Sequence, residues 1–304
     1  MKRGVIMFQK SLLNLFVLSG FLFFAGCTAS KNTSQISAQN TSSIINGTPV
    51  LETDMLAKST AGLLVNYRYD GIEKVWFQGC SASVLATRFI LTAAHCVQGT
   101  TASDMAVNFT INSFTSNQQM NKETRVNDIF STPKMVVRKV KNYIIHPGYS
   151  GSGDNDIALI ILESDIPATA IPATFLPDQY LNVTDLTTAF DGQKVQVTLL
   201  GFGIINEAEQ TETEVMRRTT LPARFDKRFV VTDQTGGTGG CFGDSGGPAY
   251  FEVEGKTFLV GVTHGPHEGS STCHEEGEWL NPSLFQKFLK DSMADLESGK
   301  AQQN

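Results

Sequence analysis

Short apolar runs separated by turn residues dominate the chain from Ile44 onward. Seven runs are rich in Val, Ile, Leu or Phe and are bounded by Gly, Asp, Asn or Pro, which is the pattern of strands. They are Gly62–Tyr67, Trp76–Leu85, Phe89–Ala93, Met135–Val140, Ile157–Leu162, Val195–Gly201 and Thr257–Val262. Regular short strands predict an all-β barrel or sandwich protein. Residues 99–134 are polar with a mixed pattern and are expected to form a long loop.

One helix is expected near the C-terminal end. Asn281 can cap it, and Pro282 suits the first helical position. An apolar stripe at helical spacing follows, made of Phe285, Leu289, Met293 and Leu296. This helix is predicted to dock on the body of the protein and to carry no chemistry.

The first 26 residues have the composition of a targeting signal. Three cations and no acidic residue are followed by the apolar stretch Leu12–Ala25, which is too short to favour a stable membrane span. The stretch ends in Phe24-Ala25-Gly26-Cys27, which resembles a bacterial lipobox, although Leu is usual where Phe24 stands. The resemblance implies a lipid on Cys27 and a place in the bacterial cell envelope. An ordinary cleaved signal with a chance cysteine is the alternative.

Charge and polarity narrow the class of partner. Residues 28–43 are polar, without an aromatic or acidic residue, which is the composition of a tether. The whole chain has a net charge of −6, and beyond residue 26 it has 21 basic and 30 acidic residues, a charge of −9. An acidic chain without a basic cluster is a poor candidate for nucleic-acid binding.

Five cysteines are present, and an exported chain favours disulfides. Lipidation of Cys27 would remove the odd one and leave four, enough for two bridges. No C-x-x-C pair occurs, and His95 beside Cys96 lacks the usual spacing of zinc ligands, so no metal site is expected.

The segment Gly243-Asp244-Ser245-Gly246-Gly247-Pro248 is the strongest chemical signal. A nucleophile must be exposed on a tight turn, with neighbouring N–H groups free to face a developing oxyanion. Glycine permits that backbone shape and keeps side chains away. A lone Ser-Gly-Gly would be an ordinary turn, but six residues in this order are much rarer.

Two further segments supply partners for Ser245. His95 stands in Leu91-Thr92-Ala93-Ala94-His95-Cys96, and Asp156 opens the apolar strand after Asp154-Asn155. A buried acid is costly without a partner, and an imidazole N–H would be a suitable one. His95, Asp156 and Ser245 can therefore act as base, orienting acid and nucleophile.

The three segments resemble the TAAHC, DIAL and GDSGGP motifs of the chymotrypsin/trypsin family, in that family's chain order. The resemblance covers Ile44 to about Met293. It implies two six-stranded antiparallel β-barrels with a C-terminal α-helix, and a serine endopeptidase without a cofactor. It also implies that the N–H groups of Gly243 and Ser245 form the oxyanion hole.

The family pattern extends to residues around the substrate. It implies the disulfides Cys80–Cys96 and Cys241–Cys273. Thr263-His264-Gly265 stands where the family usually has Ser-Trp-Gly. Thr263 would keep a hydroxyl near Asp156, and His264 would replace a large aromatic wall.

Primary specificity follows from the residue six positions before Ser245, an acid in trypsin-like members. Here that residue is Gly239, followed by Gly240. Gly265 and Gly277 would line the walls, which favours an open pocket for a large apolar or aromatic side chain.

Charged residues near the pocket leave other preferences open. Glu275, Glu276 and Glu278 follow Cys273 and could favour a basic residue, although a solvated loop is the preferred interpretation. His264 could favour an acidic residue.

The start of the expected protease domain resembles an activation site. Ile44-Ile45-Asn46-Gly47 is similar to the family's mature N-terminus. A cut between Ser43 and Ile44 would create an ammonium group that pairs with Asp244 and orders the pocket. Ser43 is neither Arg nor Lys, so the activating protease must accept a small polar residue.

The predicted organisation is a signal peptide over 1–26, a lipid-anchor tether and propeptide over 27–43, a protease domain over 44–295 and a tail over 296–304. Neither disulfide ties the tether to the body, so the activating cut would release the enzyme from its lipid. A monomer is expected. The alternatives are a catalytically silent, protease-like binding lipoprotein and an α/β-hydrolase. The latter needs a strand before the serine and the order Ser, acid, His.

Overall fold

The computed structural model describes residues 44–67, 75–114, 129–131, 134–151, 153–177, 195–226 and 228–299. All of them belong to one compact unit, residues 40–304. The expected signal, the lipidated Cys27, the tether and Ser43 lie outside the described residues. Among the residues described, no helix combines the length and apolar composition that crossing a membrane requires.

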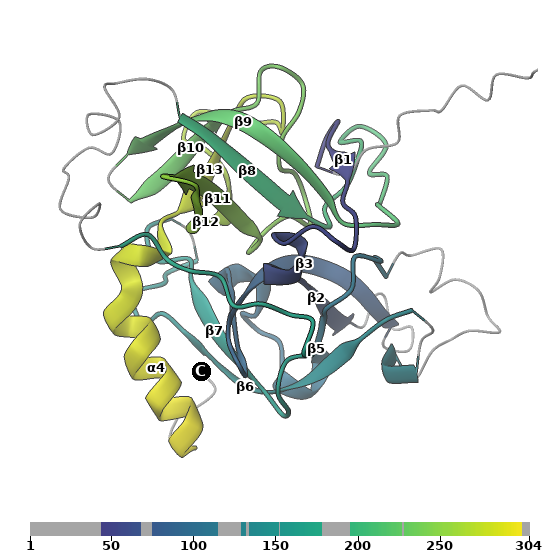
Figure 1. The fold of residues 1–304 in the computed structure, drawn as a ribbon, viewed down its shortest axis with the longest axis vertical. Coiled ribbons are helices and arrows are strands. Elements are labelled where there is room, and N and C mark those ends of the chain that lie inside the picture. Colours follow the sequence, from purple (N-terminus) through teal and green to yellow (C-terminus); the bar gives the residue numbers. More distant parts are fainter. Residues whose placement is uncertain are drawn as a thin grey trace, which may run out of the picture. The chain divides into compact units, whose positions relative to one another are not determined.

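Six strands of the first half close into an antiparallel barrel, drawn in blue and teal in Figure 1. They are β2 (Thr60–Tyr67), β3 (Val75–Ala86), β4 (Phe89–Thr92), β5 (Met105–Asn108), β6 (Val137–Ile145) and β7 (Ala158–Leu162), in the order β2-β3-β4-β7-β6-β5. Alternate residues of β2, such as Ala61, Leu63 and Val65, enter the core cluster inside this barrel. Leu64, which faces the opposite side of the strand, is also buried but belongs to a separate cluster with Ala106, Phe114 and Ile129. Alternation of inward-facing and outward-facing side chains of this kind is what a barrel wall requires.

The second half forms a second barrel, drawn in green and yellow in Figure 1. Its strands are β8 (Val195–Gly201), β9 (Arg217–Asp226), β10 (Phe229–Asp233), β11 (Pro248–Val253), β12 (Lys256–Pro266) and β13 (Glu276–Leu280). The sheet order β9-β10-β13-β12-β11-β8 closes because β8 also pairs with β9. The short strand β1 (Thr48–Pro49) adds to β9 from outside. Two six-stranded antiparallel barrels confirm the predicted fold class.

The apolar runs located seven strands correctly and missed others. Residues 99–134 were expected to form a loop, but they contain β5, which is buried between β2 and β6. The prediction was wrong there because a four-residue strand between polar neighbours has no readable periodicity. The strands β9, β10, β11 and β13 were also missed, although Leu221, Ala223 and Phe225 in the second half of β9 are buried and alternate with less buried residues.

The C-terminal helix follows its expected caps. Asn281 accepts a hydrogen bond from the Ser283 N–H at 3.0 Å, and Pro282 opens a 3₁₀ turn, Pro282–Phe285. The α-helix α4 (Gln286–Ser298) continues from it and contacts β6 and β7 of the first barrel (Figure 1). Leu289 and Leu296 are 2% exposed and join the main core. The helix thus fastens the end of the second barrel to the first.

Ser81 of β3 links the two barrels at the point where the expected nucleophile lies. Its N–H donates to the Ser245 carbonyl at 2.8 Å, and its hydroxyl donates to the Gly243 carbonyl at 3.0 Å. The same hydroxyl accepts from the Phe202 N–H at 3.0 Å. One residue of the first barrel therefore fixes two loops of the second.

Loss of the α4 anchor is expected to destabilise the protein. Replacing Leu289 by Ala removes a fully buried side chain, so the free energy of unfolding should fall by about 2–5 kcal/mol. Leu284→Ala is the matched control, because Leu284 is 46% exposed and should cost less than about 0.5 kcal/mol. Chemical denaturation of both variants measures the difference. Equal losses would show that α4 is not a packed part of the core.

Candidate active site

His95 and Asp156 form a hydrogen-bonded pair. His95 lies on a 3₁₀ turn, Ala94–Cys96, directly after β4, and Asp156 precedes β7, which pairs with β4. The Nδ1 of His95 lies 2.6 Å from Oδ2 of Asp156, and the His95 N–H donates to Oδ1 at 2.9 Å. Bonding through Nδ1 leaves Nε2 of His95 as the nitrogen that can accept a proton.

The Asp156 side chain is buried, with only 1% of the residue exposed. Burial alone would raise the pKa of its carboxyl, but hydrogen bonds from His264 and His95 outweigh burial and hold the pKa well below its ordinary value. The carboxylate therefore stays charged and can orient an imidazole and stabilise its cationic form.

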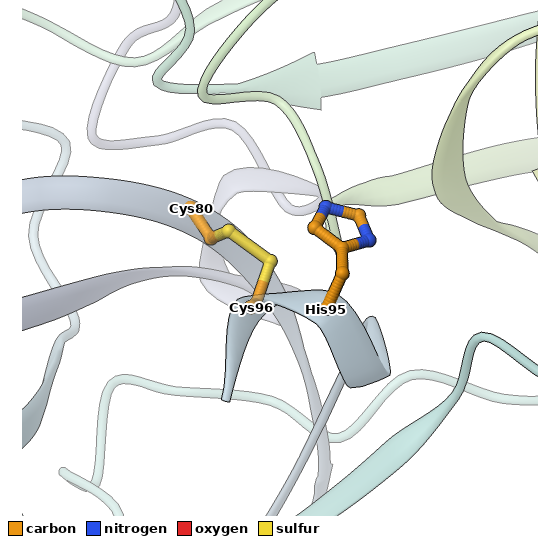
Figure 2. Close-up of side chains that lie close together, drawn as sticks. All are labelled: Cys80, His95 and Cys96. Atoms are coloured by element: carbon orange, nitrogen blue, oxygen red, sulfur yellow. A yellow bond between two sulfur atoms is a disulfide. The ribbon is translucent and has the colours of Figure 1, made fainter. Parts of the chain in front are cut away.

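A disulfide fixes the turn that carries His95. Cys96 is bonded to Cys80 of β3, and Figure 2 shows the cystine and the imidazole leaving the turn from neighbouring residues and diverging. The turn is thus covalently attached to the strand whose next residue, Ser81, holds the nucleophile loop. This is the Cys80–Cys96 pairing that the family pattern implied.

Ser245 lies on a turn that only glycine permits. Gly243 has φ +91° and Gly246 has φ +77°, both in the left-handed region. A Cβ on Gly246 would overlap the Thr92 side chain and lie 2.6 Å from the Ser81 carbonyl oxygen. Among the hydrogen bonds of the described residues, none uses the N–H of Gly243 or of Ser245. These two amides are the expected oxyanion donors.

Asp244 is buried beneath this turn and 3% exposed. Its carboxylate accepts hydrogen bonds from the N–H groups of Gly203 at 2.8 Å and Cys241 at 2.9 Å. Burial outweighs these two bonds and raises the pKa of Asp244 to about 7. Within the described part of the uncut chain, no hydrogen bond or ion pair joins it to Ile44. Ile44 itself is 1% exposed and has φ +40°.

A cavity of about 260 Å³ opens beside Ser245 and His95. Gly240, Gly265 and Gly277 line it together with the Cys241–Cys273 disulfide. Gly239 does not line it, because its N–H pairs with the Ile45 carbonyl at 3.1 Å and the Gln234 side chain covers its Cα. The small residues predicted from the sequence thus surround a pocket, with Gly240 rather than Gly239 at its wall.

Gln234 and Trp279 are pocket residues that the sequence analysis missed. Gln234 is 2% exposed, accepts from the Gly240 N–H at 2.7 Å and donates to the Cys273 carbonyl at 2.9 Å. Trp279 is 2% exposed, and its ring lies against Gly240 and Gly277. A polar residue directly after the Phe229–Asp233 strand was the only sequence signal for Gln234.

The glutamates after Cys273 do not form a solvated loop. Glu276 and Glu278 lie on β13, where Glu276 lines the cavity and forms a two-bond ion pair with Arg224. Glu278 is 9% exposed and faces His267. Glu275 alone behaves as a loop residue, since its carboxylate accepts from the N–H groups of Ser271 and Thr272.

The residue that reaches Asp156 from β12 is His264, not Thr263. The Thr263 hydroxyl donates to the Gly247 carbonyl at 3.0 Å, whereas Nδ1 of His264 lies 2.7 Å from Oδ2 of Asp156. The pairing of β12 with β13 shifts register between Thr263 and Gly265, which places His264 at the irregularity. The expected hydroxyl near Asp156 is therefore replaced by an imidazole. His264 also lines the cavity.

Potential metal ligands come together in three places among the described residues. Two of these places contain the cystines, with His95 or Glu207 nearby, and disulfide sulfur is not a thiolate ligand. The third is His95, Asp156 and His264, in which each histidine is hydrogen-bonded through Nδ1 to the Asp156 carboxylate. We assign no metal site.

Comparison with known proteins identifies the family. The trypsin family model matches residues 65–288, so the chain belongs to the trypsin family of serine proteases. A chymotrypsin from Phaedon cochleariae is 28% identical over 219 residues, which are 68% of this chain and 67% of that protein. Brachyurin from Leptuca pugilator is 31% identical over 189 residues, 58% of this chain and 72% of its own. Vitamin K-dependent protein C from Felis catus is 34% identical over 154 residues, 45% of this chain and 94% of its own.

The raised pKa of Asp244 predicts that the uncut chain loses stability as pH rises. The folded state binds this proton more tightly than the unfolded state, in which the carboxyl titrates near its ordinary value. Its contribution is therefore complete below about pH 4 and is lost as pH rises to about 7. The loss should be on the order of 2–4 kcal/mol in chemical denaturation of the uncut Ser245→Ala protein.

Two variants test the origin of this pH dependence. Asp244→Asn should remove most of the slope, because the replacement does not titrate, and the raised pKa of Glu278 leaves a smaller slope of the same sign. Asp165→Asn should keep the whole slope, because Asp165 has a side chain that is 70% exposed. A slope of unchanged size in Asp244→Asn would assign the titration to another group.

Proposed function

We propose that the protein is a serine endopeptidase that uses His95, Asp156 and Ser245. The observation that carries this proposal is that His95, bonded to the buried Asp156, lines one cavity together with Ser245. The family of the chain supports the same chemistry.

The proposed reaction runs through an acyl-enzyme. Ser245 Oγ attacks the scissile carbonyl while Nε2 of His95 takes its proton, and His95 later gives this proton to the leaving amine. Asp156 holds the imidazole in the tautomer with its proton on Nδ1 and stabilises the cation that forms. The N–H groups of Gly243 and Ser245 stabilise the oxyanion. Water then hydrolyses the acyl-enzyme, and no cofactor takes part.

In this proposal, the protein is made as a zymogen that is cut between Ser43 and Ile44. In the uncut chain Ile44 has φ +40°, which is strained for a β-branched residue by about 1–3 kcal/mol. This angle exists only while Ser43 is attached, so the cut removes the strain. The new ammonium group would supply the cation that the buried Asp244 lacks.

The proposed location is the bacterial cell envelope, where a lipid on Cys27 anchors the zymogen. The two disulfides join residues within 80–96 and 241–273, so neither ties the tether to the barrels. Cutting at Ile44 would therefore release the enzyme from its membrane anchor. The enzyme is expected to act as a monomer on protein or peptide substrates.

The pocket supports cleavage after large apolar or aromatic residues. Its walls are glycine, cystine and indole, and the carboxylate of Glu276 is engaged by Arg224. Glu207 also lines the pocket, where its carboxylate accepts from the Cys273 N–H at 3.1 Å and lies 3.7 Å from Nε2 of His274. The charge of Glu276 is therefore paired with a cation, whereas Glu207 is the acid that a basic side chain would have to engage.

A peptide-library assay tests the activity and the pocket together. The enzyme with a free Ile44 should cleave after Phe, Tyr, Leu or Met, and Ser245→Ala should lower kcat/KM by at least about 10⁴-fold. Ser298→Ala, on the exposed side of α4, is the control serine. Cleavage after Arg or Lys would assign specificity to Glu207 or Glu276, and cleavage after Glu would assign it to His264.

A protein that neither cleaves peptides nor reacts with a fluorophosphonate, while folded and cut at Ile44, would be the silent binding lipoprotein instead. An esterase would label but would not cleave peptide bonds.

The activation step can be tested with an engineered site. Replacing residues 39–43 by Asp-Asp-Asp-Asp-Lys allows enteropeptidase to cut before Ile44. Activity should rise by at least ~100-fold, because only the cut supplies a cation for the buried Asp244, and a buried charge without its partner costs about 3–5 kcal/mol. Peptide cleavage before and after the cut measures the rise. Asp244→Asn should remain inactive after cutting, and full activity in the uncut chain would contradict a zymogen.

A further inference from the structure

The carboxylate of Asp156 is shared by two imidazoles. Oδ2 lies 2.6 Å from Nδ1 of His95 and 2.7 Å from Nδ1 of His264, while Oδ1 accepts the His95 N–H. A carboxylate only accepts hydrogen bonds, so both rings must carry their proton on Nδ1. The two rings are 6.4 Å apart and approach edge to face. His95 comes from the first barrel and His264 from the second.

His264 is placed to exchange protons with solvent. Its side chain is 19% exposed, and it lines the cavity that contains Ser245. With Nδ1 bonded to Asp156, its Nε2 is the nitrogen that gains or loses a proton. The ring can therefore be neutral or cationic without breaking its bond to Asp156.

The surroundings of His264 favour its cationic form. The hydrogen bond to Asp156 raises the pKa of His264, burial opposes this, and the charges of Asp156 and Glu278 raise it further. The titratable groups that interact with His264 are Asp156 before β7, His95 on its turn and Glu278 on β13. Further charges act on these partners: Tyr149 lies near Asp156, His267 and Asp154 near Glu278, Arg228 pairs with Asp154, and Glu276 lies near His267.

We propose that His264 is a positioning residue that shares Asp156 with His95 and that protonation of His264 withdraws this carboxylate from catalysis. The proposal rests on the proposed endopeptidase activity. Neutral His264 donates one hydrogen bond and keeps Asp156 ionised and oriented. Cationic His264 brings a positive charge next to Oδ2 of Asp156, the same oxygen that must stabilise the imidazolium formed on His95. One negative charge then faces two cations.

The consequence is that the loss of activity at acidic pH should involve the binding of two protons, one by His95 and one by His264. The productive enzyme requires both rings to be neutral before Ser245 loses its proton, so the two titrations are coupled. Because Asp156 stabilises the cationic form of His264, the pKa of His264 is raised and the cation persists to higher pH than in a free imidazole. Activity should therefore fall earlier and more steeply on acidification than with one titrating histidine.

His264→Asn separates the bond from the charge. The Nδ2 of Asn occupies nearly the place of Nδ1 of His, so it can donate to Asp156 but cannot become cationic. The acid limb of kcat/KM should move to lower pH by about 0.5–1 unit and become a one-proton limb. His264→Ala lacks the donor as well, and its plateau at alkaline pH should fall on the order of 10-fold below that of His264→Asn. All are measured in the full chain cut at the engineered site.

His274→Asn is the control, because His274 has a side chain that is 50% exposed and contacts Glu207 rather than Asp156. It should retain the shape of the wild-type profile. An acid limb in His264→Asn that matches the wild type would overturn the proposal. So would equal alkaline plateaus in His264→Asn and His264→Ala.

A spectroscopic readout is independent of activity. In Ser245→Ala protein with ¹⁵N-labelled histidine, two downfield Nδ1–H resonances are expected, and His264→Asn should remove one of them. A single resonance in the parent protein would overturn the shared carboxylate. If the wild-type enzyme cleaves nothing while both resonances are present, the proposed function fails and the shared carboxylate stands.

Discussion

The buried charge of Asp156 is the constraint on which the site depends. A carboxylate with 1% exposure is stable only if other groups meet its charge, and the partners come from both barrels. Meeting this demand brings the turn of His95 and the bulged end of β12 to one point. The cores of the barrels are largely apolar, and apolar packing has little directional preference. The hydrogen bonds to Asp156 are directional, so they specify how the loops of the two barrels must meet.

Ser81 supplies the complementary constraint on the nucleophile. Its backbone and hydroxyl hold Ser245 and Gly243 by their carbonyls, while the amides of the same two residues make no hydrogen bond within the described part of the chain. The preceding residue, Cys80, is bonded to the turn of His95. The turn of His95 and the loop of Ser245 are therefore both attached to two consecutive residues of β3, Cys80 and Ser81. A shift of that strand would move the two together.

The sequence predicted what is local and chemically specific. The glycines around Ser245, the capped C-terminal helix and seven strands all follow from short-range rules. The register of β12 could not be predicted, because Thr263 and His264 both suit a strand and only the irregularity opposite β13 decides which one meets Asp156. Gln234 was missed for the same reason: its hydrogen bonds to Gly240 and Cys273 exist only after the barrel has closed.

The two cystines also bear on how the chain acquires its covalent structure. Their partners are separated by only 16 and 32 residues, and the first pair precedes the second entirely. Closing a short loop costs little chain entropy, and four cysteines offer three pairings. A chain that emerges from its N-terminus can therefore oxidise Cys80 with Cys96 before Cys241 becomes accessible. Emergence in this order would favour the native pairing over the two alternatives before the barrels have folded.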